Sequence, residues 1–155
     1  MAGIAELMVR SVVTATPFEN VAEVTKRMTD KGVGAVLVVE NGVLSGLFTE
    51  RDLLNKVVSA GRDPHVVDVG TVATRDPVTV EVGAPLRAVL HVFRQKKFRH
   101  LPVVDGGKPV GILSTRDFLD YLLEGLERYI DEMKYSSELA TGVDPYDHVG
   151  GSYGR

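Results

Sequence analysis

Two hydroxyl and carboxylate pairs are the residues of this 155-residue chain whose types and spacing could bind a polar ligand. Thr49 precedes Asp52 by three positions, and Ser114 precedes Asp117 by three. At the start of a helix, such a pair can cap free backbone N–H groups. It can also hold a ligand, because a carboxylate accepts hydrogen bonds from a diol and the positive helix terminus suits a phosphate. Spacing alone favours capping, and the two roles can coexist.

Both pairs lie inside a seven-residue pattern that occurs twice, at residues 46–52 and 111–117. The offset is 65 positions (111 − 46). The same offset relates Arg10 to Arg75 and Leu54 to Leu119, with no gap in between. A register that persists over this length indicates a duplicated structural unit.

Hydrophobic periodicity predicts the elements that position each pair. Their order is β-α-β-β-α in both copies. A short extended segment comes first, then an amphipathic helix, then two β-rich runs joined by tight-turn dipeptides, then a last helix that begins at the pair. The β segments are expected at 12–15, 35–39 and 43–48, and at 78–82, 101–104 and 109–113. The last helix is expected at about 50–60 and 115–134.

The predicted domain organisation is a first repeat at 1–62, a second repeat with an extended C-terminal helix at 63–135, and a flexible tail at 136–155. A unit of about 60 residues is marginal alone, so the repeats should share an interface. The last helix carries an apolar stripe from Leu119 to Met133. Its own domain, the first repeat or a second chain could cover that stripe.

Composition excludes several classes of protein. The net charge is −3, so a nucleic acid is not expected as a partner. The apolar runs are too short for a membrane span, and cysteine is absent, which favours a cytoplasmic setting. The four histidines show no metal-ligand or triad spacing, and no P-loop or nucleophile-elbow motif occurs. We therefore expect neither an enzyme nor a metal site.

The Gly-apolar-apolar-Thr/Ser-x-x-Asp pattern, at the end of the third strand of a β-α-β-β-α unit, resembles the cystathionine beta-synthase (CBS) domain. Two copies in tandem resemble a CBS pair, or Bateman module, over about residues 4–126. The resemblance implies an α/β (α+β) fold of two repeats related by a pseudo-two-fold axis, with two clefts between them. It also implies a disc-like homodimer.

The resemblance further implies which residues bind an adenosine-containing ligand. Asp52 and Asp117 would accept the ribose hydroxyls, and Thr49 and Ser114 would hold phosphate. His100 could equally be structural, and a glycine before each pair could admit a purine or simply allow close packing. The expected nucleotide-binding residues are Thr14, Val33, Gly34, Ala35, Thr49, Arg51, Asp52, Thr79, Arg99, His100, Leu101, Pro102, Gly111, Ser114, Arg116 and Asp117.

The two sites are not expected to be equal. The second copy has Arg99, His100 and Pro102 where the first has Gly34, Ala35 and Leu37. We therefore predict that the site with Asp117 binds more tightly than the site with Asp52.

The predicted function is a non-catalytic regulatory or energy-sensing module that binds AMP, ADP or ATP and acts on a separate protein effector. It requires no cofactor. The alternatives are a structural or dimerisation module without ligand, and a sensor of S-adenosylmethionine.

Overall fold

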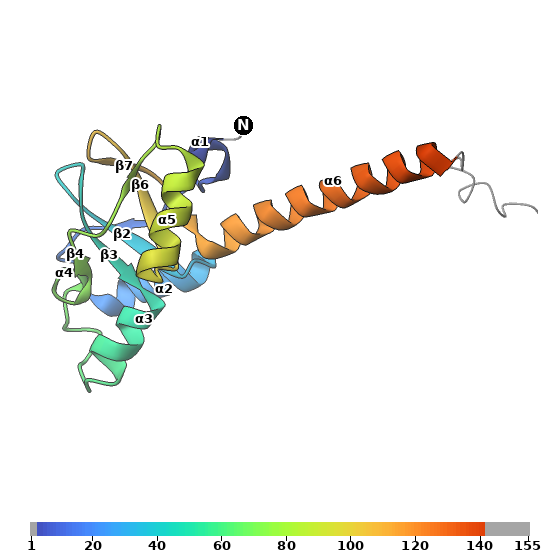
Figure 1. Ribbon diagram of the computed structural model, residues 1–155. Coiled ribbons are helices and arrows are strands. Elements are labelled where there is room, and N and C mark those ends of the chain that lie inside the picture. The colour runs from blue at the N-terminus through green and yellow to red at the C-terminus, as the bar shows by residue number, and fades with distance from the viewer. Residues whose placement is uncertain (1–2, 142–155) are drawn as a thin grey trace, which may run out of the picture. The chain divides into compact units, whose positions relative to one another are not determined.

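The computed structural model describes residues 3–141 of the chain. These residues fall into two compact units, one ending at Asp117 and the other beginning at Phe118. The first unit contains all the strands and every helix but the last. The second unit is the greater part of that last helix, which is coloured orange to red in Figure 1.

Each repeat contains the predicted β-α-β-β-α order after an initial short helix that the periodicity did not reveal, and the second repeat has one additional short strand, β4. The first repeat consists of α1 (Ile4–Leu7), β1 (Thr14–Ala15), α2 (Val21–Lys31), β2 (Ala35–Glu40), β3 (Val43–Thr49), α3 (Glu50–Asp52) and the π-helix η1 (Leu53–Val58). The second consists of α4 (Val69–Val72), β4 (Thr74–Arg75), β5 (Val80–Glu81), α5 (Leu86–Lys96), β6 (His100–Asp105), β7 (Lys108–Ser114) and α6 (Thr115–Thr141).

The strands form two sheets with matching registers, which confirms the duplication. The orders are β1-β2-β3-β4 and β5-β6-β7, with a parallel first pair and an antiparallel hairpin in each sheet. The hairpin register shifts after Val38 in one sheet and after Val103 in the other, positions related by the repeat offset. Asn41 and Gly42 have φ values of 52° and 77°, as a tight hairpin turn requires.

The short helices α1 and α4 pack in the core of the repeat to which they do not belong in sequence. Ile4 and Met8 lie with Leu101 and Leu113 of the second repeat. Conversely, Val69 and its neighbours in α4 lie in the core of the first repeat. Each core therefore contains the short helix that belongs in sequence to the other repeat. The linear boundary between residues 62 and 63 remains a prediction.

A third apolar cluster joins the two sheets. It consists of buried Ala35, Leu37 and Leu47 from β2 and β3, with half-buried Ile112 from β7 packed against them. This cluster supplies the shared interface that the small size of one repeat predicts.

The last helices of the two repeats differ from the predicted ones in opposite ways. In the first repeat, the α-helix ends after three residues and continues as the π-helix η1, a rare form that is often found at functional sites. In the second repeat, α6 extends to Thr141, beyond the predicted end near residue 134. The remainder of the predicted tail, residues 142–155, lies outside the described residues.

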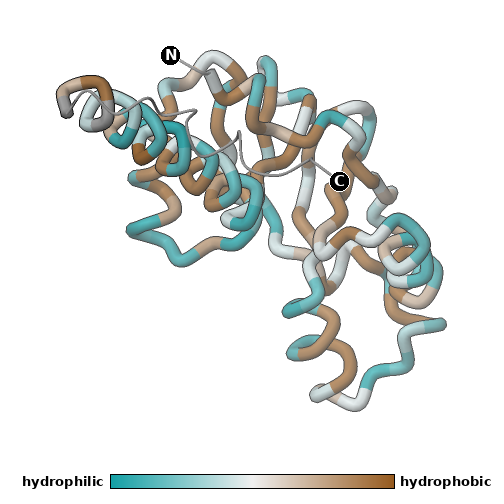
Figure 2. Tube along the Cα trace, turned by 90° about the vertical axis from the view of Figure 1, so that its right-hand side faces the viewer, coloured by the Kyte–Doolittle hydropathy of each residue, from teal (hydrophilic) through white to brown (hydrophobic). Residues whose placement is uncertain are grey.

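The apolar stripe predicted on α6 is exposed in this chain, with Leu119 53% and Tyr129 59% accessible. Hydrophobic and hydrophilic residues alternate along this helix (Figure 2). Within residues 3–141, no helix combines the length and hydrophobicity needed to cross a membrane.

Candidate functional site

The hydroxyl and carboxylate pairs both form the capping interactions that their spacing predicts. The backbone N–H and Oγ1 of Thr49 each donate to Asp52 Oδ2 at 3.0 Å, and the Asp52 N–H donates back to Thr49 Oγ1 at 3.3 Å. Ser114 and Asp117 make the same three bonds at 3.1, 2.5 and 3.1 Å. Each pair therefore fixes the start of a helix and the orientation of its own carboxylate.

Each pair also lines a cavity. We name the cavities after their carboxylates: the Asp52 cavity has a volume of about 280 Å³, and the Asp117 cavity about 610 Å³. Both are large enough to receive part or all of a small organic ligand.

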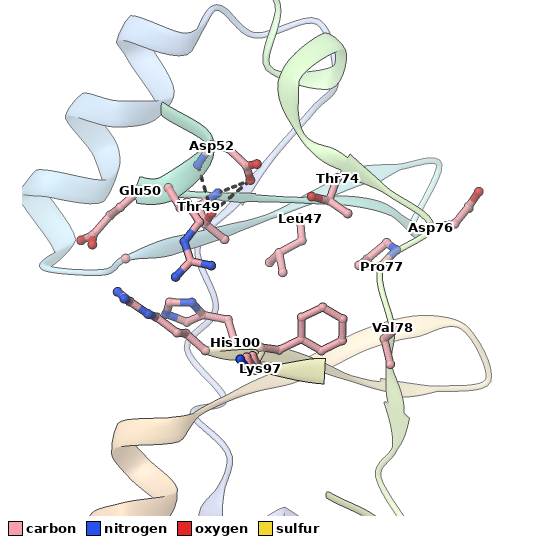
Figure 3. Close-up of a pocket in the computed structure, with 14 residues that line it drawn as sticks. Leu47, Thr49, Glu50, Asp52, Thr74, Asp76, Pro77, Val78, Lys97 and His100 are labelled. Atoms are coloured by element: carbon pink, nitrogen blue, oxygen red, sulfur yellow. Dashed lines mark hydrogen bonds between the residues drawn. The ribbon is translucent and has the colours of Figure 1, made fainter. Parts of the chain in front are cut away.

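The Asp52 cavity is lined by apolar side chains and by charged side chains of both signs. Leu47 and Val78 contribute apolar surface, and Arg51 and Lys97 contribute positive charge. In Figure 3, Leu47 points into the cavity from one sheet and His100 from the other. A flat, mostly apolar ring could lie between them, with charged groups at its edge.

The Asp117 cavity is built from both repeats in the same manner. Val33, which precedes β2, and Ala35, the first residue of β2, provide apolar surface. Ser114, Arg116 and Asp117, where β7 ends and α6 begins, provide the hydroxyl, the guanidinium and the carboxylate.

Arg99 and His100 line both cavities, together with Gly34 and Glu50. The presence of these two basic residues in the second copy alone therefore does not distinguish the Asp117 cavity from the Asp52 cavity. The physical reason lies in the packing of the sheets, because the start of β6 lies beside the start of α3 from the other repeat. Each carboxylate thus faces a strand of the opposite repeat, and the two cavities share one wall.

Burial holds the pKa of His100 below its ordinary value of 6.5. The carboxylates of Glu50 and Asp117 oppose this shift, and the Arg99 guanidinium reinforces it. His100 is therefore mostly uncharged near neutral pH. A phosphate beside it would favour the protonated ring, so anion binding and proton uptake would be coupled there.

Five of the sixteen expected binding residues lie outside both cavity linings: Thr14, Thr79, Leu101, Pro102 and Gly111. Leu101 is fully buried in the core of the second repeat. A Cβ on Gly111 would come within 2.5 Å of Met8 Sδ, so the missing side chain makes room for Met8 and not for a purine.

Residues outside the sixteen expected ones also line the cavities, chiefly Glu50, Lys97 and Phe98. Lys97 ends α5 in the left-handed conformation, with a φ of 51°. At the equivalent place after α2, Gly32 adopts a φ of 65°. A lysine at a position that favours glycine is the sequence signal that could have found this residue.

No group of three or more His, Cys, Asp or Glu side chains that could hold a metal ion forms within residues 3–141.

Comparison with known proteins agrees with this architecture. The CBS domain family model matches the chain twice, at residues 4–59 and 69–124. An uncharacterized protein of Methanopyrus kandleri is 34% identical over 87% of this chain and 70% of its own length. The CBS domain-containing protein YhcV of Bacillus subtilis is 32% identical over 76% of this chain and 83% of its own length. The chain spans only 26% and 17% of the length of two other relatives, from Arabidopsis thaliana and Schizosaccharomyces pombe.

A solved structure adds a ligand-bound relative. The CBS domain protein PAE2072 of Pyrobaculum aerophilum, in complex with AMP, superposes with a TM-score of 0.69 at 26% identity, over 75% of this chain and 89% of that one. Because the CBS domain family model matches two segments that together make up most of the sequence, this chain belongs to the CBS domain family and carries two CBS domains in tandem.

Proposed function

We propose that this chain is a non-catalytic regulatory module that binds an adenine nucleotide of the AMP type between its two CBS domains. The observation that carries the proposal is the composition of the Asp117 cavity. It brings a carboxylate, a hydroxyl and two guanidiniums to a partly apolar space of about 610 Å³.

Each part of AMP has a chemically suitable partner there. The ribose diol offers two donors to the Asp117 carboxylate. Arg99 and Arg116 can form charge-assisted hydrogen bonds with a phosphate. Val33 and Ala35 supply apolar surface for the base. The AMP complex of the Pyrobaculum relative supports this choice of ligand.

The two arginines of the Asp117 cavity also distinguish among the other candidate ligands, ADP, ATP and S-adenosylmethionine. ADP and ATP carry the same diol and more negative charge, so they are compatible with the two arginines. S-adenosylmethionine has no phosphate, so it cannot make the phosphate contacts that Arg99 and Arg116 offer. We therefore place S-adenosylmethionine below the nucleotides.

A ligand can regulate only if it binds two conformations of the module with different affinities. The wall shared by the cavities is where such a difference would arise, because Arg99 and His100 belong to both. The effect would pass to a separate effector protein. The exposed stripe on α6 would take part in a homodimer. The cytoplasmic setting stays a prediction, which fractionation of the source cells would test.

A structural or dimerisation module is the second candidate. The capping bonds favour it, because both carboxylates are already employed in holding helix starts. In that case the cavities would bind no nucleotide, and the melting temperature of the protein would not change when nucleotide is added.

The decisive experiment is calorimetric titration of the full chain with AMP, ADP, ATP and S-adenosylmethionine. We expect binding of AMP that is strongly weakened by Asp117→Ala. If no adenine nucleotide binds, or if Asp117→Ala binds as the parent does, the proposal fails. Ligand at one hundred times its dissociation constant should also add about 2.7 kcal/mol to the free energy of unfolding.

A further inference from the structure

The two carboxylates make identical capping bonds, but they differ in what holds their second oxygen. Lys56 Nζ lies 2.8 Å from Asp52 Oδ1. The same nitrogen donates a hydrogen bond to the carbonyl oxygen of Val72 at 3.0 Å. Lys56 therefore connects the Asp52 carboxylate to the end of the short helix α4.

This ion pair is well placed to persist. The Asp52 side chain is only 10% exposed, and the Lys56 side chain is 44% exposed. A pair that is partly shielded from water is screened less than a surface pair. In addition, the bond to Val72 limits the freedom of the lysine, which lowers the entropic cost of holding it at the carboxylate.

The two carboxylates differ in how many of their hydrogen-bond acceptor sites remain free. An ionised carboxylate offers about four lone-pair sites, two on each oxygen. Two bonds from Thr49 use Asp52 Oδ2, and Lys56 uses one site on Oδ1. At Asp117, two bonds from Ser114 use Oδ2, and no group within residues 3–117 bonds to Oδ1.

Because the capping bonds use both sites on Oδ2, both hydroxyls of a ribose diol would have to donate to Oδ1. Asp117 Oδ1 has both acceptor sites for them, whereas Asp52 Oδ1 has one unless Lys56 leaves. At the repeat offset, the residue equivalent to Lys56 is Tyr121, whose side chain is a phenol and has no ammonium group. Asp117 and Tyr121 are four positions apart on α6, the same spacing as Asp52 and Lys56.

We infer that Lys56 is a specificity-determining residue that occupies the Asp52 carboxylate in place of a ribose, so that the Asp117 cavity alone accepts a nucleotide with an intact diol. This inference rests on the proposed function. The Asp117 site is still predicted to bind more tightly than the Asp52 site. The reason is now Lys56, because the basic residues Arg99 and His100 line both cavities.

The test is calorimetric titration of the full chain and its variants with AMP. The parent should bind one AMP per chain. Lys56→Met keeps the aliphatic stem but removes the charge, and it should bind a second AMP at a site whose affinity rises on the order of tenfold or more. Adding Asp52→Asn to Lys56→Met should return the stoichiometry to one. The probe 2′-deoxy-AMP, which lacks the diol, should show no such gain.

Two variants complete the design. Lys26→Met is the matched control, because Lys26 forms an exposed pair with Asp30 at the same spacing and should leave AMP binding unchanged. Tyr121→Lys introduces a lysine four residues after Asp117 and should weaken AMP binding at the remaining site by roughly tenfold. This second variant leaves Lys56 and its bond to Val72 intact.

Three outcomes would overturn the inference. The first is a parent that already binds two equivalent AMP molecules. The second is a folded Lys56→Met variant that binds one AMP, as the parent does. The third is a Tyr121→Lys variant with the parent's affinity. In each of these the parent still binds AMP, so the proposed function survives. Absence of binding in the parent and in every variant would overturn both.

Discussion

Replacement of Asp117 by Asn tests the candidate site most directly, because it removes a charge and changes almost no volume. The Asn carbonyl can still accept the capping bond from the Ser114 N–H, so the start of α6 should survive. The substitution removes Oδ1, the carboxylate oxygen that would accept the hydroxyl groups of the ligand.

The expected magnitude follows from the bonds that the ligand would make. Two ribose hydroxyls on a carboxylate contribute about 3 kcal/mol at the lower end of the range for charged acceptors, which suits a half-buried group such as Asp117. Because the single oxygen of Asn is used for the capping bond, the amide nitrogen replaces Oδ1 and retains about 1 kcal/mol of this by donating to a ribose hydroxyl oxygen. The net loss of about 2 kcal/mol corresponds to roughly a 30-fold increase in the dissociation constant for AMP.

Isothermal calorimetry would measure the change, with Asp52→Asn as the matched control. That control removes the same kind of capping carboxylate, but one that Lys56 already occupies, so the affinity for AMP should stay within about twofold. Equal losses in both variants, or no loss in Asp117→Asn, would refute the reasoning. Circular dichroism would confirm that both variants fold.

Three further predictions concern titration, packing and assembly. Because the pKa of folded His100 is depressed, its contribution to stability is complete above the unfolded value of about 6.5 and is lost as the pH falls through the folded value. Urea titrations from pH 8 to pH 5 should therefore show a smaller loss of stability in His100→Gln than in the parent, and parallel curves would contradict this. Gly111→Ala should cost roughly 1–3 kcal/mol in urea unfolding, because the new Cβ would overlap Met8. Gly83→Ala, where no atom lies within 4 Å, is its control, and equal costs would show that the contact with Met8 is not responsible. If α6 forms a homodimer interface, Leu126→Glu should shift the protein to a monomer in analytical ultracentrifugation, whereas a dimer that persists would place the interface elsewhere.

Much of the fold could be predicted because local patterns and tertiary contacts agree. The helix over Val21–Lys31 has a capping Asn before it and a left-handed glycine after it, and its apolar face is buried. The hairpin turn at Asn41 and Gly42 adopts the positive φ values that its residues favour. The short helix α1 could not be predicted, since four residues carry too little periodicity to identify a helix.

The sequence by itself determined the duplication, the two capping pairs and the family, because each depends on residue types at fixed spacing along the chain. Only the tertiary structure decided how the repeats share their parts. It placed α1 and α4 each in the core of the other repeat, placed Arg99 and His100 on a wall common to both cavities, and bonded Lys56 to the Val72 carbonyl oxygen of α4. The physical reason is that a cavity between two repeats is built from segments far apart in the chain, whose proximity depends on how the sheets pack.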